Sequence, residues 1–410
     1  MVLGSDGENF GLCSLGGKEV RKVYVKDLKE GLIFSAPLYI EGNNVFVPDG
    51  VPLKKMDIAR LNFLALDFVE TEGVLIGDLS QNGTGEAEEQ NTPPEKPSVA
   101  SLSGVQENKG EYRSYMDLIE RLDYFCLNIA DGTGVEPRTI DDITGRLLQA
   151  VRDQRQTYIE FILGAEIKNH ELAKSLINTS ILSALIAIEL KMLNHKVMQV
   201  VTGALLHDVG MLKIPKEIVQ KKGGLSPEEL KRIQSHPVYA YNFVTKEMLL
   251  PETVGFIVLQ HHERWDGEGY PKRIAGEEID IGARIVSAAD AFEAMVSKKP
   301  YRKSMLGYQA MKNLLADNMR RFDPNVIRAF IQTMGIYPIG SIVLLNNGAI
   351  ARVIKVMPIA TLRPRIKILV NEYGKVLNQA ERTEIELLAE KGLFITKAMD
   401  PREISDKYAE

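Results

Sequence analysis

The chain has very few cysteines and no long apolar run. Only Cys13 and Cys126 occur in 410 residues, and two cysteines make neither a disulfide framework nor a cysteine-based zinc motif, which fits a reducing compartment. No apolar run reaches the roughly 18 residues of a membrane span. Residues 1–17 lack the basic start and the continuous apolar stretch of a signal peptide. We therefore expect a cytoplasmic protein without a membrane span.

An excess of positive charge is also missing. The 50 lysines and arginines are outnumbered by 55 aspartates and glutamates, and the net charge is −5. Binding to polymeric DNA or RNA is driven by surfaces rich in lysine and arginine, so a nucleic-acid polymer is not the expected partner. A small anionic nucleotide needs only a local positive pocket. The 45% hydrophobic content supplies ample material for a core.

Changes in composition divide the chain into four parts. Residues 79–110 are rich in Ser, Gly, Glu, Gln, Asn and Pro, which predicts a flexible linker. Before it, residues 1–78 contain short strand-like runs and a helix expected over residues 53–66, which together form a small α+β regulatory module. Residues 111–335 have the apolar spacing of a helical bundle. Residues 336–410 form a β-rich C-terminal appendage and tail, so the fold class is multidomain and mainly α.

Two local patterns fix element positions within these parts. The sequence Ser226-Pro227-Glu228-Glu229 is typical of a helix start, and we expect the helix it opens to deliver His236. Strand-like runs are expected at residues 341–345, 349–356 and 365–370, with a turn at residues 346–348 between the first two.

Histidine is scarce, and its distribution is the feature that points to chemistry. The chain has six histidines, and four of them fall in one ordered series. This series reads His207-Asp208, His236, His261-His262 and then Asp290. Imidazole and carboxylate ligands without a nearby cysteine fit iron, manganese or zinc. Five or more donors exceed what a three-ligand catalytic zinc site needs, so two ions are favoured over one, with Asp208 as the bridge.

The ordinary alternative is that these histidines are hydrogen-bonded in a core or exposed in loops. Their context argues against it. The pair His207-Asp208 ends the apolar run of residues 200–206, and His261-His262 follows a second apolar run at residues 256–260. Polar groups at the ends of buried helices need partners, and a metal ion is one such partner.

These residues resemble a known family. Residues 261–271 read HHERWDGEGYP and are similar to the HHExxDGxGYP signature of HD-GYP proteins, a branch of the HD phosphohydrolase superfamily whose characterised activity is cyclic di-GMP hydrolysis. Companion motifs follow in the same order, at residues 205–210, 235–237, 289–295 and 299–302. The resemblance covers roughly residues 160 to 330 and implies an HD-type helical catalytic domain.

The resemblance implies a function and a ligand set. It implies a cyclic di-GMP phosphodiesterase with two divalent ions per chain, iron or manganese being expected. It assigns His207, Asp208 and Asp290 to one ion, and the other ion takes His236, His261 and His262. Such a pair of ions lowers the pKa of a water between them and neutralises phosphoryl oxygens. Catalysis is therefore expected at the His207-Asp208 pair.

The same resemblance places substrate-binding groups. It puts cations for the substrate phosphates at Lys299 and Arg302. In the loop of residues 265–271, glycines including Gly269 allow close backbone approach, so that Tyr270 can be presented to a ligand. Trp265, the only tryptophan, is either a base-stacking surface or simple packing.

Two positions depart from the family pattern. Where the family often has a helical Glu-x-x-x-His, the chain has Glu171 and Ser175, so Glu171 can reach the first metal but a third ion lacks its imidazole. Where many members have lysine after His-Asp-x-Gly, the chain has Met211. Lys213 replaces the missing ammonium if the segment is extended, because positions two apart then point the same way, and cannot do so if it is helical.

These departures keep a second function open. In that alternative the domain is a degenerate one that binds a cyclic dinucleotide and signals through partner proteins with little turnover. Retention of every ligand of a two-metal site favours the enzyme. Regulatory protein partners and a homodimer stay open in both cases.

Overall fold

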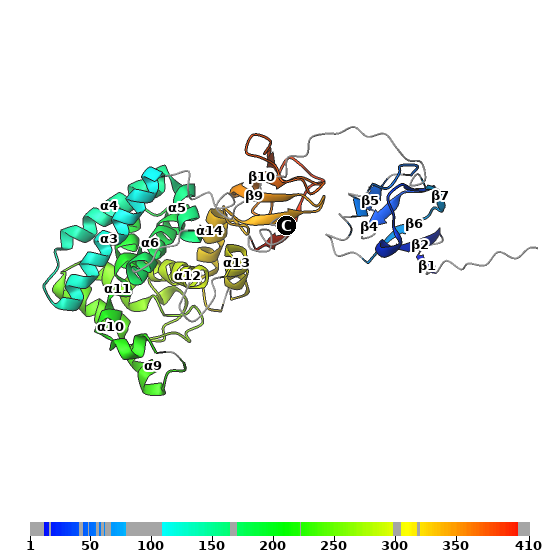
Figure 1. Cartoon of the computed structure of the whole chain (residues 1–410). Coiled ribbons are helices and arrows are strands. Elements are labelled where there is room, and N and C mark those ends of the chain that lie inside the picture. The colour runs from blue at the N-terminus through cyan, green and yellow to red at the C-terminus, as the bar shows by residue number, and fades with distance from the viewer. Residues whose placement is uncertain are drawn as a thin grey trace, which may run out of the picture. The chain divides into compact units, whose positions relative to one another are not determined.

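The computed structural model describes residues 12–15, 18–40, 44–47, 49–54, 57–58, 61, 67–78, 109–164, 170–221, 223–297, 305–317 and 320–400. In chain order, it contains an N-terminal module of strands, a mainly helical part and a C-terminal five-stranded antiparallel sheet (Figure 1). The predicted fold class is therefore confirmed. Residues 79–108 of the predicted linker lie outside the described residues.

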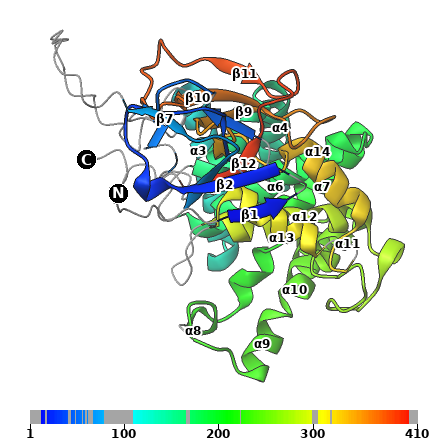
Figure 2. The ribbon, with the colours of Figure 1, turned by 90° about the vertical axis from the view of Figure 1, so that its right-hand side faces the viewer.

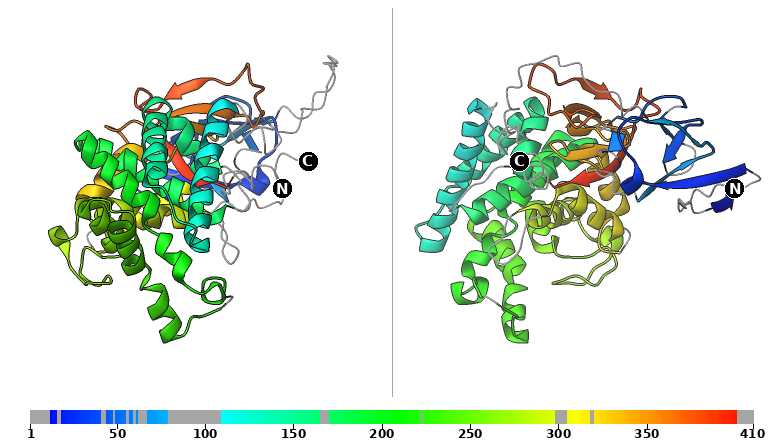
Figure 3. Two further views of the ribbon diagram at one scale, coloured as in Figure 1. Left: turned by 90° about the vertical axis from the view of Figure 1, so that its left-hand side faces the viewer. Right: turned by 45° about the vertical axis from the view of Figure 1, so that its right-hand side comes forward.

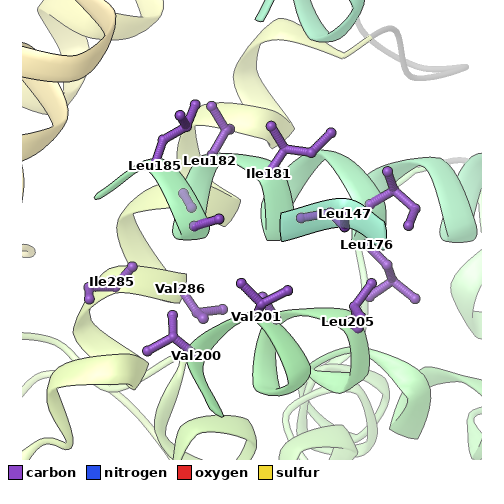
Figure 4. Packing of buried hydrophobic residues seen from close by; sticks show 14 of the residues in the cluster. Leu147, Leu176, Ile181, Leu182, Leu185, Val200, Val201, Leu205, Ile285 and Val286 are labelled. Carbon is purple, nitrogen blue, oxygen red and sulfur yellow. The ribbon is translucent and has the colours of Figure 1, made fainter. Parts of the chain in front are cut away.

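The helical part is built around one central helix, α6 (Glu171–Glu189), which is apolar on all sides and packs against α3, α7, α12 and α14. A helix that is apolar all round belongs in a core. It is also the one helix in the described part of the chain that is long and apolar enough to cross a membrane, and 72% of that stretch is buried inside the fold. Figure 4 shows Leu176, Ile181, Leu182 and Leu185 of α6 in one buried cluster with residues of α7 and α12, such as Val201 and Val286.

The other helices surround α6. They are α3 (Lys109–Asp131), α4 (Pro137–Asp153), α5 (Arg155–Gly164), α7 (Asn194–Leu206), α11 (Glu252–Gln260), α12 (Ile281–Val296), α13 (Gly307–Ala316) and α14 (Pro324–Met334). Helices α3 and α4 run side by side along one side of the helical part (Figure 3). Short elements follow α7: η4 (Val209–Lys213), α8 (Lys216–Val219), α9 (Pro227–Ile233), α10 (His236–Asn242) and the π-helix η5 (Phe243–Glu247). Of these, α8 and α9 extend away from the remaining helices (Figure 2).

The predicted helix start at Ser226 is confirmed, but the expected extent of that helix is wrong. The Ser226 hydroxyl accepts a hydrogen bond from the Glu229 backbone N–H, and the Glu229 carboxylate accepts one from the Ser226 backbone N–H. Helix α9 then ends at Ile233, and His236 opens the separate helix α10. Pro237 explains the break, because proline lacks the N–H that a helix interior needs and is tolerated only in a first turn.

The C-terminal sheet has the strand order β11-β10-β9-β8-β12. Its strands are β8 (Ile342–Leu345), β9 (Ile350–Lys355), β10 (Arg365–Val370), β11 (Glu384–Glu386) and β12 (Ile395–Met399). The three predicted strands correspond to β8, β9 and β10. The predicted turn lies between β8 and β9, where Gly348 has a φ of 86°, a conformation that favours glycine.

The N-terminal module has a five-stranded sheet of order β1-β2-β6-β4-β5 and a two-stranded sheet of β3 and β7. The strands are β1 (Leu12–Leu15), β2 (Lys18–Tyr24), β3 (Leu32–Phe34), β4 (Leu38–Ile40), β5 (Asn44–Val47), β6 (Phe68–Thr71) and β7 (Leu75–Asp78). Their inward residues form a small separate core that includes Val23, Leu38 and Val69. Of the helix predicted over residues 53–66, residues 57, 58 and 61 are described as helical, and most of the others lie outside the described residues.

Candidate metal centre

Three helix ends bring the histidines of the series together. His207 caps the C-terminus of α7, His236 is the first residue of α10, and His261 caps the C-terminus of α11. Glycine allows these helices to approach closely. A Cβ at Gly203 of α7 would lie 2.5 Å from Ile257 of α11, and one at Gly282 of α12 would lie 2.6 Å from the same isoleucine. Ile257 therefore fills the space that two glycines leave.

The three buried imidazoles are held in the same way. The Nδ1 atoms of His207, His236 and His261 each lie 2.7 Å from the carbonyl oxygen three residues earlier, at Ala204, Ile233 and Val258 respectively. A carbonyl oxygen only accepts, so Nδ1 carries the proton and donates. This fixes the ring orientation and leaves the lone pair on Nε2, the form in which histidine binds a metal.

The Nε2 atoms of His236 and His261 converge on one oxygen of Asp208. Asp208 Oδ1 lies 3.0 Å from His236 Nε2 and 3.7 Å from His261 Nε2, and these two nitrogens are 3.3 Å apart. With His262 added, one donor atom from each of the four residues lies within 4.8 Å of the others. Ligands that bind one ion at about 2.1 Å stand roughly 3–3.5 Å apart, so the spacing fits a shared cation.

The other oxygen of Asp208 faces a second group of donors. His207 Nε2 lies 3.7 Å from Asp208 Oδ2 and 3.6 Å from Asp290 Oδ1. This nitrogen is buried and has no hydrogen-bond partner. A buried polar atom without a partner is costly, and a metal ion at this position would remove the cost. The structure thus places His207, with Asp290 beside it, near one oxygen of Asp208. It places His236 and His261 near the other oxygen, together with His262.

Electrostatics tune these groups as ligands. Burial lowers the pKa of His207, but the carboxylates of Asp208 and Asp290 outweigh burial and raise that pKa to about 9. Burial raises the pKa of Asp208, but His207, His236 and His261 hold it well below its usual value. The pKa values of His261 and His262 are lowered, chiefly by burial, so these rings are neutral. A proton and a divalent cation therefore compete for the place between His207 and the two aspartates.

The two positions that depart from the family pattern lie outside this cluster. Glu171 is exposed in the first turn of α6, and its role as a ligand stays a prediction. The Ser175 hydroxyl donates a 2.7 Å hydrogen bond to Glu293 of α12.

The second departure, at Met211, lies in the segment Val209–Lys213, which is a 3₁₀-helix. With about three residues per turn, Lys213 points away from the direction of Met211. Lys213 lines a different cavity of about 340 Å³, together with Tyr239 and Asn242.

The loop after His262 presents Tyr270 beside the centre. The Tyr270 ring stacks on His262, with centroids 4.8 Å apart. Gly269 allows this approach, since a Cβ there would lie 2.4 Å from the backbone nitrogen of Arg264. Burial, together with the negative charges of Asp208 and Asp290, raises the pKa of Tyr270. Its hydroxyl is therefore protonated and can donate a hydrogen bond to an anion.

One residue that the sequence analysis did not assign holds the loop in place. Glu263 is buried, and its Oε1 accepts hydrogen bonds from the backbone N–H groups of Lys272 (2.5 Å) and Arg273 (3.1 Å). A charged residue directly after two ligands and a long apolar run was the available signal.

Of the remaining predicted residues, Trp265 packs with Arg284, whose guanidinium lies 5.6 Å from the ring centre. Arg284 itself pairs with Asp323 at 2.7 Å, which agrees with a packing role for the tryptophan. Lys299 and Arg302 lie outside the described residues.

Comparisons with known proteins identify the domain in which these residues lie. A family model described as an HD domain matches residues 161–326, and a KOW domain associated with HD domain matches residues 342–407. Cyclic di-GMP phosphodiesterase PdeB of Borreliella burgdorferi is 30% identical over 236 residues, 57% of this chain and 62% of that protein. A cyclic di-GMP phosphodiesterase of Thermotoga maritima is 36% identical over 152 residues, 37% of this chain and 41% of that protein.

A third relative, 3'3'-cGAMP-specific phosphodiesterase 2 of Vibrio cholerae, is 34% identical over 128 residues, 31% of this chain and 24% of that protein. The chain spans less than two thirds of the length of each of these three relatives. It is an HD-domain protein related to the HD-GYP cyclic di-GMP phosphodiesterases, with a KOW-like C-terminal sheet. The family resemblance seen in the sequence is confirmed.

Gly210 is expected to be essential for placing Asp208. A Cβ at Gly210 would lie 2.0 Å from the carbonyl oxygen of His236, so η4 and α10 can pack only around a glycine. We expect Gly210→Ala to lower the free energy of unfolding by about 1–3 kcal/mol through overpacking. In the matched control Gly145→Ala, a Cβ in α4 meets nothing within 4 Å, and the change should add about 0.5–1 kcal/mol. Denaturant unfolding of both variants measures the difference, and equal midpoints would contradict this packing.

Glu263 should support the loop that carries Tyr270. Glu263→Ala leaves two backbone N–H groups without their acceptor and should cost about 1–3 kcal/mol of unfolding free energy. Glu263→Gln keeps an acceptor oxygen and should cost less. The control is Glu268→Ala, in the same loop, where the side chain is 71% exposed. Denaturant unfolding of the three variants tests this, and a Glu263→Ala variant as stable as Glu268→Ala would show that the carboxylate does not hold the loop.

Proposed function

We propose that this chain hydrolyses the phosphodiester bonds of cyclic di-GMP at a centre of two divalent metal ions. The observation that carries the proposal is the arrangement around Asp208. One oxygen faces His236 and His261 at 3.0 and 3.7 Å, while the other faces His207 at 3.7 Å. A carboxylate with metal-ligand groups on both sides is the arrangement expected of a bridging ligand. Relatives named cyclic di-GMP phosphodiesterases, at 30–36% identity, support the substrate.

The donor set fits iron or manganese. Four imidazoles and two carboxylates gather at the centre, and such nitrogen and oxygen donors suit borderline and hard divalent ions. In this proposal His207, Asp208 and Asp290 hold one ion, and His236, His261 and His262 hold the other with Asp208 shared. When bound, the two ions would activate a water at neutral pH and neutralise the phosphoryl oxygens of the substrate.

The protein's own groups would orient the metal ligands and bind the substrate phosphates. The backbone carbonyls of Ala204, Ile233 and Val258 keep three imidazoles fixed, so the ligands need no rearrangement during the reaction. Tyr270, a protonated phenol beside His262, would donate a hydrogen bond to a substrate phosphate. Lys299 and Arg302, assigned by the family resemblance, would add positive charge there.

A second candidate is a receptor that binds a cyclic dinucleotide with little turnover. Met211 is the observation that favours it, because the position lacks the lysine of many relatives and Lys213 lines a different cavity. The full set of metal ligands favours hydrolysis, since a receptor has no need of an activated water. A related dinucleotide is an alternative substrate, because one relative is named for cGAMP.

Loss of Asp208 separates the two functions. We expect the anaerobically purified chain to contain two ions and to form linear dinucleotide from cyclic di-GMP with added iron or manganese. In the Asp208→Ala variant, both the bound metal and the turnover of cyclic di-GMP should be lost. Partners outside the ligand shell are worth about 10–100-fold, so loss of the bridge should reduce turnover by more than about 100-fold. Metal analysis and product chromatography on the same sample measure both quantities.

The matched control is Asp123→Asn. Asp123, on α3, pairs with His170 at 2.9 Å and is not one of the residues proposed to bind metal or substrate, so its loss should change neither metal content nor turnover. Two ions with bound nucleotide and no product would favour the receptor. A wild-type chain that binds no metal would show that the ligand assignment fails.

A further inference from the structure

A further carboxylate is buried one helical turn from Asp290, and the proposed mechanism does not use it. Glu293 lies on α12, is 1% exposed, and follows Asp290 by three residues. Both of its oxygens accept hydrogen bonds. Oε2 accepts from the Ser175 hydroxyl at 2.7 Å, and Oε1 accepts from the Asn178 amide at 3.3 Å and from the Ser297 hydroxyl. Ser175 and Asn178 lie on the central helix α6.

The contacts of Glu293 extend to a third helix. Tyr115 of α3 is fully buried, and its hydroxyl donates a 2.6 Å hydrogen bond to the Asn178 side-chain carbonyl. Burial, with a contribution from the charge of Glu293, raises the pKa of Tyr115, so the phenol keeps its proton as a donor. The chain Tyr115–Asn178–Glu293–Ser175 thus connects α3, α6 and α12 through buried polar groups.

The donors to Glu293 carry no charge. Two hydroxyls and an amide satisfy its oxygens, and none of the ion pairs within the described residues includes it. A buried carboxylate without a cation is costly unless a positive charge lies near. Residues three apart on a helix lie on one face with Cβ atoms about 5–6 Å apart, so Glu293 is a neighbour of Asp290. An ion held by Asp290 would place a positive charge one helical turn from Glu293.

We propose that Glu293, held by Ser175, is the positioning residue that sets Asp290 against the metal and balances the charge of the bound ion. This inference rests on the metal centre of the proposed function. Ser175 is then a donor to Glu293 at the position where the family pattern often has a histidine. The bonds to α6 fix the rotation of α12, and with it the direction of Asp290 toward His207, which lies 3.6 Å from its oxygen. Such outer partners of metal ligands change metal affinity about 10–100-fold.

The test is a titration of the metal-free full chain with Mn²⁺. Ser175→Ala removes one small donor, and Glu293→Gln keeps the shape of the side chain while removing its charge. Both should raise the Mn²⁺ dissociation constant about 10-fold or more. Ser175→Thr keeps the hydroxyl and should restore the wild-type value. The matched control is Ser180→Ala, on the same helix, where the buried hydroxyl bonds only the Leu176 carbonyl.

A role in folding alone would give a different result. Ser180→Ala and Ser175→Ala would then change thermal stability alike and leave the Mn²⁺ affinity unchanged. The absorption spectrum of bound Co²⁺ should also shift in Ser175→Ala if Asp290 is misplaced, and stay unchanged in Ser180→Ala. Wild-type Mn²⁺ affinity in Ser175→Ala would overturn the inference, even if Glu293→Gln fails to fold. A wild-type chain that binds no Mn²⁺ would instead overturn the metal centre itself.

Discussion

The site depends on one repeated hydrogen bond, from an imidazole Nδ1 to the carbonyl three residues earlier. At the ends of α7 and α11 this carbonyl belongs to the last turn of the helix, where carbonyl oxygens have lost their helical donors. The histidine ring therefore satisfies a group that the helix end leaves free. Because the same bond holds His207, His236 and His261 at 2.7 Å, the three Nε2 atoms are directed by backbone geometry.

Close helix packing is the second requirement, because the oriented imidazole rings must also lie close enough to share a metal centre. Ile257 lies against Gly203 on one side and Gly282 on the other, so α11 approaches both α7 and α12. Gly210 lets η4 approach α10 in the same way. These three contacts join the segments that carry His207, Asp208, His236, His261 and Asp290. The core around α6 then supports the arrangement, since α7 and α12, which lead to His207 and carry Asp290, are among its neighbours.

Much of the site could be predicted from the sequence, and the limits have physical causes. The metal ligands stand in recognisable local patterns, at the ends of apolar runs, and the family resemblance ordered them. The Glu293 contacts could not be predicted, because Tyr115, Asn178 and Glu293 are far apart in sequence and no local spacing connects them. Glu171 was expected near the metal from its helical spacing; it lies exposed in the first turn of α6, and its role as a ligand stays a prediction. Spacing gives the face of a helix, but only packing decides what that face meets.

The conformation of η4 determines where positive charge for an anionic substrate can come from. An extended segment would have placed Lys213 beside the position of Met211. The 3₁₀-helix η4 turns Lys213 toward Tyr239 and Asn242 instead. Asp208, directly before η4, therefore contributes its carboxylate to the centre, while Lys213 contributes no charge there. Asp208 and Asp290 alone would repel a phosphate. In the proposed function the bound ions would reverse this local charge, with Tyr270 as a neutral donor beside them and Lys299 and Arg302 as the cations that the family resemblance assigns. In the proposed enzyme, substrate recognition and catalysis then depend on the same ions, which makes a metal-independent receptor difficult to build from this arrangement.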